Sequence, residues 1–209
     1  MHLFENREDA ARQLSKALLT YKGQQPLVLS IPRGGVPLGR IVADDLGGEL
    51  DVVLVRKLGA PFNPEFAVGS IGESGQIFVA DYAQTAGADA AYLAAEADKQ
   101  LATIRRRRAQ YAAVAPSVNA KGRTVIIVDD GLATGATMRS ALAEIRSCQP
   151  ARLICAVPVA SAEAAAYIRS ECDHFVCLSV EADFQGVGQF YRDFAQVSDE
   201  VAVALLARS

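Results

Sequence analysis

The chain has 209 residues, of which 51% are hydrophobic and 22% are charged, and its formal net charge is −3. This composition excludes a disordered or low-complexity chain, and the negative charge argues against a protein that binds nucleic acid through a basic surface. No apolar run is long enough for a membrane helix, and Met1 to Asp9 are polar, so we expect a cytoplasmic protein without a signal peptide.

Short apolar segments alternate with amphipathic ones over most of the chain. The predicted helices begin at a cap on Asn6, near Pro37, at Ala136, at Ala162 and after Ser198. The predicted strands are Leu27–Ile31, Asp51–Val55, Thr124–Val128, Leu153–Pro158 and Phe175–Val180. This alternation predicts an α/β fold, with a central parallel sheet covered by helices on both faces, in one domain over residues 1–209.

Two segments depart from the alternation. An insertion over residues 58–121 contains a predicted hairpin, Val68–Gly72 with Gln76–Ala80, and a long Ala-rich helix, Ala88–Val114. We expect the insertion to lie over the carboxyl edge of the sheet, where ligands bind in such folds. Its helix must pack either on the sheet or on a partner subunit, and we favour the partner subunit. The second segment, about residues 181–197, is irregular and aromatic-rich, and we expect it to form a small hood whose aromatic rings either stack on a ligand or fill the core.

The cysteines and a run of basic residues say less about function. Cys148, Cys155, Cys172 and Cys177 form no C-x-x-C pair, so we expect reduced, buried thiols. The run Arg105–Arg108 would span about 300° of a helix and cannot form one stripe. Its side chains are expected to be solvated or ion-paired, with a subunit contact or a basic rim as alternatives.

The segment from Thr124 to Thr137 carries the clearest chemistry. A buried strand delivers Asp129 and Asp130 at its carboxyl end, and a loop of glycines and threonines leads into a helix. Backbone N–H groups of such a loop and the helix N-terminus bind anions such as phosphate, while two carboxylates can accept hydrogen bonds from vicinal hydroxyls. A ligand with a phosphate close to a diol is a ribose 5-phosphate.

Other nucleotide motifs fit this segment poorly. A P-loop requires a Lys after its last glycine, and the dinucleotide-binding fingerprint requires three glycines in a fixed spacing. A capped helix with an Asp turn explains Gly131 but not two acids at the end of a strand. We also consider a magnesium-dependent phosphohydrolase built on Asp129 and Asp130, but no separate nucleophilic Asp motif is present.

The stretch Val128-Asp-Asp-Gly-Leu-Ala-Thr-Gly-Ala-Thr137 resembles the signature of type I phosphoribosyltransferases, which bind 5-phosphoribosyl 1-pyrophosphate (PRPP). Residues 4–10, 31–39 and 190–194 resemble a subgroup of stand-alone bacterial members. The resemblance covers most of the chain, and it implies the fold of that family and assembly as a homodimer.

The resemblance also implies roles for individual residues. Asp129 and Asp130 would hold the ribose hydroxyls and, through the diol or water, Mg²⁺. The remaining PRPP-binding residues would be Gly131, Ala133, Thr134, Gly135, Ala136 and Thr137. The pyrophosphate-binding residues would be Arg33, Gly34, Gly35 and Lys57. The catalytic residues would be Asp129, Asp130, Lys57 and Arg33.

The reaction implied is a magnesium-dependent transfer in which a nucleobase or other nitrogen acceptor displaces pyrophosphate from PRPP. Hypoxanthine–guanine enzymes carry an Asp where this chain has Ala133, so the small-molecule acceptor stays open. Glu65 and Glu73 are weak candidates for the general acid or base. We expect Leu58–Gly75 to be a mobile lid. The alternative function is a PRPP-binding regulatory protein without turnover.

Overall fold

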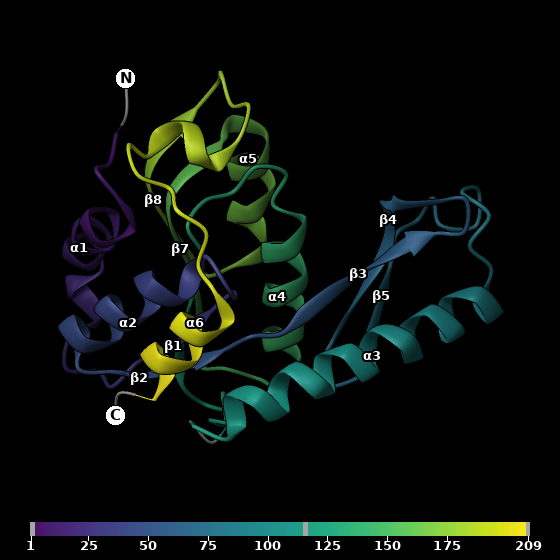
Figure 1. The fold of residues 1–209 in the computed structure, drawn as a ribbon, viewed down its shortest axis with the longest axis horizontal. Helices are drawn as coiled ribbons and strands as arrows, with labels where there is room; N and C mark the ends of the chain where they lie inside the picture. Colours follow the sequence, from purple (N-terminus) through teal and green to yellow (C-terminus); the bar gives the residue numbers. More distant parts are fainter. Residues whose placement is uncertain (1–2, 115–116, 208–209) are drawn as a thin grey trace.

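The protein is described by a computed structural model that covers residues 3–114 and 117–207, without the side chain of Glu65. Five parallel strands form the central sheet in the order β2-β1-β6-β7-β8 (Figure 1). These strands are β1 (Leu27–Ser30), β2 (Glu49–Val52), β6 (Thr124–Val128), β7 (Arg152–Ser161) and β8 (His174–Glu181).

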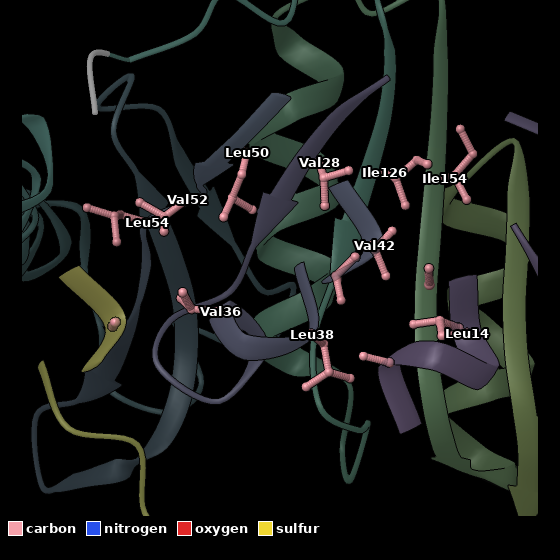
Figure 2. Packing of buried hydrophobic residues seen from close by; sticks show 14 of the residues in the cluster. Leu14, Val28, Val36, Leu38, Val42, Leu50, Val52, Leu54, Ile126 and Ile154 are labelled. Atoms are coloured by element: carbon pink, nitrogen blue, oxygen red, sulfur yellow. The ribbon is translucent and has the colours of Figure 1, made fainter. Parts of the chain in front are cut away.

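The central strands are mainly apolar, which suits a sheet covered by helices on both faces. Figure 2 shows Val28, Ile126 and Ile154 packed against Leu14 and Val42 from two helices on one face. The intervening strand residues form a second buried cluster with the helices of the other face. The helices are α1 (Arg7–Ala17), α2 (Gly35–Leu46), α4 (Ala136–Ser147), α5 (Ala162–Glu171) and α6 (Asp199–Leu206), with short 3₁₀ turns η1 (Leu19–Tyr21) and η2 (Val187–Phe190).

The predicted caps on two helices are confirmed. The side chain of Asn6 accepts a hydrogen bond from the N–H of Asp9 at the start of α1. The side chain of Ser198 accepts one from the N–H of Val201 at the start of α6. In the described residues, no helix combines the length and the apolar character that crossing a bilayer requires.

The strand order places the ligand site of this fold. From β1 the chain moves outward to β2, and the later strands then add on the other side of β1, beginning with β6. The order therefore reverses between β1 and β6, and ligands in open α/β sheets bind beside the carboxyl ends of the strands at such a point. The predicted α/β fold with a parallel sheet is confirmed, and the reversal lies between residues 31–35, which follow β1, and residues 129–137, which follow β6.

An arm, residues 55–112, extends away from the five-stranded sheet (Figure 1). It consists of an antiparallel sheet in the order β3-β4-β5 and the long helix α3. The elements are β3 (Val55–Ala60), β4 (Asn63–Gly72), β5 (Ile77–Val79) and α3 (Ala90–Ala112). The predicted hairpin corresponds to β4 and β5. The predicted strand Asp51–Val55 is divided, because β2 ends at Val52 and β3 begins at Val55.

The helix α3 packs within its own chain. Its buried residues Leu93, Ala97, Ile104 and Tyr111 belong to the same apolar cluster as residues of β3, β4 and α6. Tyr92 adds a hydrogen bond of 2.8 Å from its hydroxyl to the carbonyl of Gly59. The expectation that this helix packs on a partner subunit is therefore wrong for its buried face, which the sheet of the arm covers.

Two polar contacts fix the turn between β4 and β5. Arg108 donates to both carboxylate oxygens of Glu73 at 2.6 Å, and Glu144 of α4 accepts hydrogen bonds of 2.7 Å from the N–H and hydroxyl of Ser74. The segment expected as a lid, Leu58–Gly75, thus forms strands with one end held against the body of the protein. Its closure over a ligand stays a prediction.

The aromatic residues of the hood pack on one another and on a neighbouring guanidinium, and stacking of one of them on a ligand stays a prediction. Phe190 and Tyr191 are buried, and Phe184 packs on Phe190 with ring centroids 4.9 Å apart. Phe194 packs on Tyr191 and also on the guanidinium of Arg7, which lies 3.8 Å from the centre of its ring.

The expectation of buried thiols is confirmed in full only for Cys155. The other three cysteines are partly exposed free thiols. Burial raises the pKa of Cys155 and raises that of Cys177 to about 11, which favours the unreactive thiol form.

Candidate active site

The two predicted carboxylates lie side by side at the end of β6, Asp129 half-buried and Asp130 buried. The N–H of Asp130 donates to Oδ1 of Asp129 at 2.9 Å. Oδ2 of Asp130 accepts from Nε and Nη2 of Arg7 at 3.0 and 2.8 Å. Within residues 3–114 and 117–207, no hydrogen bond reaches the second oxygen of either carboxylate, so each residue has one acceptor available for a ligand.

Burial shifts the titration of both carboxyl groups. Burial and the neighbouring Asp130 carboxylate raise the pKa of Asp129 well above its ordinary range. Burial also raises the pKa of Asp130, although the positive charge of Arg7 opposes the shift. Two adjacent carboxylates repel one another, so a site of this kind favours a ligand or cation that supplies positive charge or hydrogen-bond donors.

The loop after Asp130 offers the complementary set of groups. Ala133, Thr134, Ala136 and Thr137 are exposed, and Gly135 has a left-handed φ of 72° at the start of α4. In the described chain, the backbone N–H groups of residues 133, 134, 135 and 137 have no hydrogen-bond acceptor. Free donors at the N-terminus of a twelve-residue helix are suited to binding an anion. We call residues 133–137 the phosphate loop.

The loop between β1 and α2 touches the carboxylates directly. A Cβ atom on Gly34 would lie 2.2 Å from Oδ2 of Asp130, and one on Gly35 would lie 2.6 Å from the carbonyl oxygen of Val128. The Pro32–Arg33 peptide bond is cis. Arg33 is partly exposed, and its Nη1 lies 3.8 Å from Oδ1 of Asp199 in α6. Gly34 thus makes room for the Asp130 side chain, and Gly35 makes room for the backbone at the end of β6.

A small cavity joins this loop to the phosphate loop and the arm. Its volume is about 40 Å³, and its lining includes Pro32, Arg56, Arg107 and Thr137. Such a volume holds at most a few water molecules. Lys57 is exposed on β3 opposite Ser70, and alternation along the strand places its side chain on the other face from Arg56. The basic residues that line the cavity are therefore Arg56 and Arg107.

A larger cleft of about 980 Å³ separates the arm from α4 and α5. Residues 76–80 of the arm line one side of it, and Thr134 and Ala136 of the phosphate loop line another part. Tyr167 of α5 also lines this cleft and donates a hydrogen bond to the carbonyl of Thr134. The arm thus reaches the vicinity of the phosphate loop.

Several site residues were not predicted from the sequence. Arg7 contacts Asp130 across a separation of 123 residues. The buried hydroxyl of Tyr191 donates to the carbonyl of Asp130 at 2.7 Å. A Cβ on Gly131 would lie 2.7 Å from Val187, which shows how closely the hood approaches this loop. The residues 4–10 and 190–194, which resemble the bacterial subgroup, were the only sequence signal for these contacts.

Of the two acid–base candidates, Glu73 is engaged away from the site and Glu65 stays untested. Both carboxylate oxygens of Glu73 bind Arg108 in the turn of the arm, and the side chain of Glu65 lies outside the described part of the structure. Among the described residues, no three His, Cys, Asp or Glu side chains cluster as a metal site. Any cation near Asp129 and Asp130 would therefore need further oxygen ligands from a substrate or water.

The sequence profile of the phosphoribosyl transferase domain matches residues 3–194. The chain belongs to this family. It is 41% identical over 210 aligned residues to proteins from two strains of Mycobacterium tuberculosis that bear the name "Putative phosphoribosyl transferase". The alignment covers 100% of this chain but 47% of those proteins, so the chain spans about half their length.

Solved structures show the same fold as this phosphoribosyl transferase domain. The protein TT1426 of Thermus thermophilus superposes with a TM-score of 0.88 at 46% identity, over 99% of this chain and 98% of that one. The AQ2163 protein of Aquifex aeolicus has a TM-score of 0.50 at 15% identity, over 84% of this chain and 73% of that one. The match to TT1426 covers the arm and the hood as well as the central sheet.

Proposed function

We propose that this phosphoribosyl transferase domain transfers the ribose 5-phosphate group of PRPP to a nitrogen acceptor, with release of pyrophosphate. One observation carries the proposal. The loop after β6 presents two carboxylate oxygens, on Asp129 and Asp130, and then four N–H donors in the phosphate loop, all without partners among the described residues. A vicinal diol supplies donors and a phosphate supplies acceptors, so a ribose 5-phosphate complements this arrangement. The family match supports the same substrate class.

The chain's own residues act mainly by positioning and by charge. Asp129 and Asp130 hold the ribose hydroxyls, and the phosphate loop holds the 5-phosphate, which together orient the anomeric carbon. Arg33 and the guanidinium groups of Arg56 and Arg107 offset charge on the departing pyrophosphate. The acceptor nitrogen forms a bond to the anomeric carbon as the bond from that carbon to pyrophosphate breaks, and pyrophosphate leaves with the electron pair.

Mg²⁺ fits the donor set of this site. Mg²⁺ commonly binds one or two carboxylates and completes its coordination with substrate oxygens and water. Asp129 and Asp130 each have one free carboxylate oxygen for that purpose, acting directly, through water or through the diol. When bound, the cation would neutralise negative charge on the pyrophosphate and the adjacent carboxylates.

A reaction screen tests the proposal. The protein is incubated with PRPP, Mg²⁺ and pools of nucleobases and small amines, and the products are analysed by mass spectrometry. We expect release of pyrophosphate together with one new ribotide, whose mass identifies the acceptor. Binding of PRPP without pyrophosphate release from any pool would contradict the transferase proposal and indicate a regulatory protein.

We also propose that the protein forms a homodimer. Four large apolar side chains are exposed on the arm, Phe62, Phe66, Val79 and Tyr82, and Phe62 is 93% exposed. Apolar groups gathered on a projecting element favour contact with another protein surface. Light scattering after size-exclusion chromatography should give twice the mass of the 22.2 kDa chain. A monomer at all tested concentrations would contradict this part of the proposal.

A further inference from the structure

We propose that Arg7 is a positioning residue for the ribose diol. In this role it holds one oxygen of the Asp130 carboxylate, so that the other oxygen faces the ligand beside the free oxygen of Asp129. This inference rests on the proposed function, because it assigns Arg7 to the same ribose-binding site. Neither the family match nor the relatives assign a role to this residue.

The contact between Arg7 and Asp130 is well formed and sheltered from solvent. Nε and Nη2 of Arg7 both donate to Oδ2 of Asp130, at 3.0 and 2.8 Å. The two side chains are only 12% and 13% exposed. An ion pair that is largely removed from water is much less mobile than an exposed pair, so it can fix the rotation of a carboxylate.

Arg7 is itself held from two further directions. Its Nη1 donates to the carbonyl of Ala195 at 2.7 Å, and its guanidinium lies 3.8 Å from the centre of the Phe194 ring. All three nitrogens of the guanidinium are therefore engaged, and the group is packed against an aromatic ring. Lys could supply the charge but neither the forked hydrogen bonds nor the same packing.

The surroundings of Asp130 complete the arrangement. Its carbonyl accepts from the hydroxyl of Tyr191 at 2.7 Å, and its carboxylate lies against Gly34, where a Cβ atom would be only 2.2 Å from Oδ2. The residue is thus fixed at both its backbone and its side chain. The only carboxylate oxygens without hydrogen bonds in this pair, within the described chain, are Oδ1 of Asp130 and Oδ2 of Asp129, one for each hydroxyl of a diol.

Removal of Arg7 would change this pair in a specific way. Oδ2 of Asp130 would lose both donors, and the carboxylate could turn or take up a proton to reduce repulsion from Asp129. The phosphate loop has no contact with Arg7 among the hydrogen bonds of the described residues, so its donors would stay in place. The defect should therefore fall on recognition of the diol and not on recognition of the phosphate.

The test compares two ligands that differ only at the diol. Ribose 5-phosphate and 2-deoxyribose 5-phosphate are titrated by calorimetry into the wild type, Arg7→Gln, Arg7→Lys and the control Arg12→Gln. Arg12 lies on the same helix, is exposed and pairs with Glu8. We expect wild type and control to favour the ribose ligand by about tenfold or more. Arg7→Gln should reduce this preference to below about threefold, with Arg7→Lys between them.

A second comparison tests whether Arg7 acts through Asp130. In an Asp130→Asn background, Arg7→Gln should change the ligand preference by less than about twofold, because two changes in one interaction are not additive. A fold defect alone would weaken both ligands equally and leave their ratio unchanged, which would overturn the inference. Tighter binding of the ribose ligand by Arg7→Gln would also overturn it and would show that Arg7 blocks the site.

The outcomes separate this inference from the proposed function. If the wild type binds neither PRPP nor ribose 5-phosphate, the proposed function itself fails. If the wild type binds both and favours the diol, but Arg7→Gln and Arg7→Lys keep the preference of the wild type, only the role of Arg7 is wrong. Arg7→Lys retains the positive charge and serves as the deciding variant if Arg7→Gln does not fold.

Discussion

Two pairs of acidic residues in this protein each lie beside one arginine. The two groups differ in how many of their carboxylate oxygens accept a hydrogen bond. In the first, Arg108 binds Asp51 and Glu73 at the base of the arm. In the second, Arg7 binds Asp130 beside Asp129 in the candidate active site. Both arginines are largely buried, with side chains 16% and 12% exposed.

The group at the base of the arm uses every carboxylate oxygen. Oδ1 of Asp51 accepts from Arg108 and from the N–H of Val52, and Oδ2 accepts from the N–H of Val118. Both oxygens of Glu73 accept from Arg108, which also donates to the carbonyl of Val52. Burial alone would lower the pKa of Arg108, but the hydrogen bonds and charges of Glu73 and Asp51 outweigh that effect and raise it.

The group in the site leaves two carboxylate oxygens without partners in the described chain. Neither oxygen is among the fully buried unsatisfied atoms of the described residues, so both are open to a ligand or water. The comparison teaches that a buried arginine with two acids does not by itself mark an active site. The candidate active site is distinguished by carboxylate oxygens and backbone N–H groups that form no hydrogen bond within the described chain.

The largest loss of stability should follow from breaking the group of Arg108, Asp51 and Glu73 at the base of the arm. Arg108→Met leaves the buried carboxylate of Asp51 and the partly exposed one of Glu73 without a counter-charge, and loss of one partner of a buried ion pair costs about 3–5 kcal/mol. Denaturant unfolding should show this loss, whereas Arg106→Met, at an exposed position of the same helix, should change the free energy of unfolding by less than about 0.5 kcal/mol. Equal stabilities of the two variants would contradict this view of the arm.

A smaller effect is expected at the contact between hood and site. Tyr191→Phe removes the hydrogen bond to the buried carbonyl of Asp130 and should lower the free energy of unfolding by about 1–3 kcal/mol. Burial and the charge of Asp130 raise the pKa of Tyr191, so its hydroxyl stays protonated as a donor. Tyr82→Phe is the control, because that hydroxyl donates to Ala67 from a residue that is 50% exposed. A Tyr191 variant as stable as its control would show that the bond is dispensable.

The basic run of α3 allows a sharper test of the small cavity. Arg107 lines that cavity with Pro32 and Thr137, whereas Arg105 is exposed. Arg107→Gln should weaken pyrophosphate binding by roughly three- to tenfold, because a guanidinium that contacts phosphate gives a charge-assisted hydrogen bond. Calorimetry with pyrophosphate compares this variant with Arg105→Gln. The same affinity in both variants would exclude a specific role for Arg107.

The smallest expected change concerns the motion of the arm. The turn Glu73–Gly75 is held by Arg108 and Glu144, so its hydrogen exchange should not depend on ligand. The opposite turn, between β3 and β4, carries the exposed side chain of Phe62 at the far end of the arm. Exchange at this turn should slow when PRPP and Mg²⁺ are added, if the arm closes over the site. Unchanged protection throughout residues 58–75 would contradict the predicted lid.

The sequence predicted the parts of the site that are contiguous in the chain. Asp129, Asp130 and the phosphate loop follow one buried strand, so their position depends mainly on local geometry and on the parallel order of the sheet. The central strands were recognisable because both faces of the sheet are buried and the residues are mainly apolar. The caps on Asn6 and Ser198 were likewise local features.

The parts that the sequence did not predict depend on distant packing. Arg7 meets Asp130 only because α1 and the hood lie together beside the end of β6, and the resemblance of residues 4–10 to a bacterial subgroup does not indicate which residue Arg7 contacts. The strand β3 was missed because Arg56, Lys57 and Gly59 interrupt its apolar pattern, and its partner β4 supplies the pairing that stabilises it. The sequence also did not predict that Arg56, and not Lys57, lines the small cavity, because this depends on which face of β3 each side chain occupies.

The central claim is that the free oxygens of Asp129 and Asp130 bind the diol of PRPP. Its most direct test is a calorimetric titration of PRPP, in the presence of Mg²⁺, into the wild type and the Asp129→Asn/Asp130→Asn variant. Loss of the charged acceptors should weaken binding by about 1.5–3 kcal/mol, or roughly ten- to a hundredfold. A weakened but still folded variant is the predicted result. Equal affinities for PRPP in the two proteins would contradict the account.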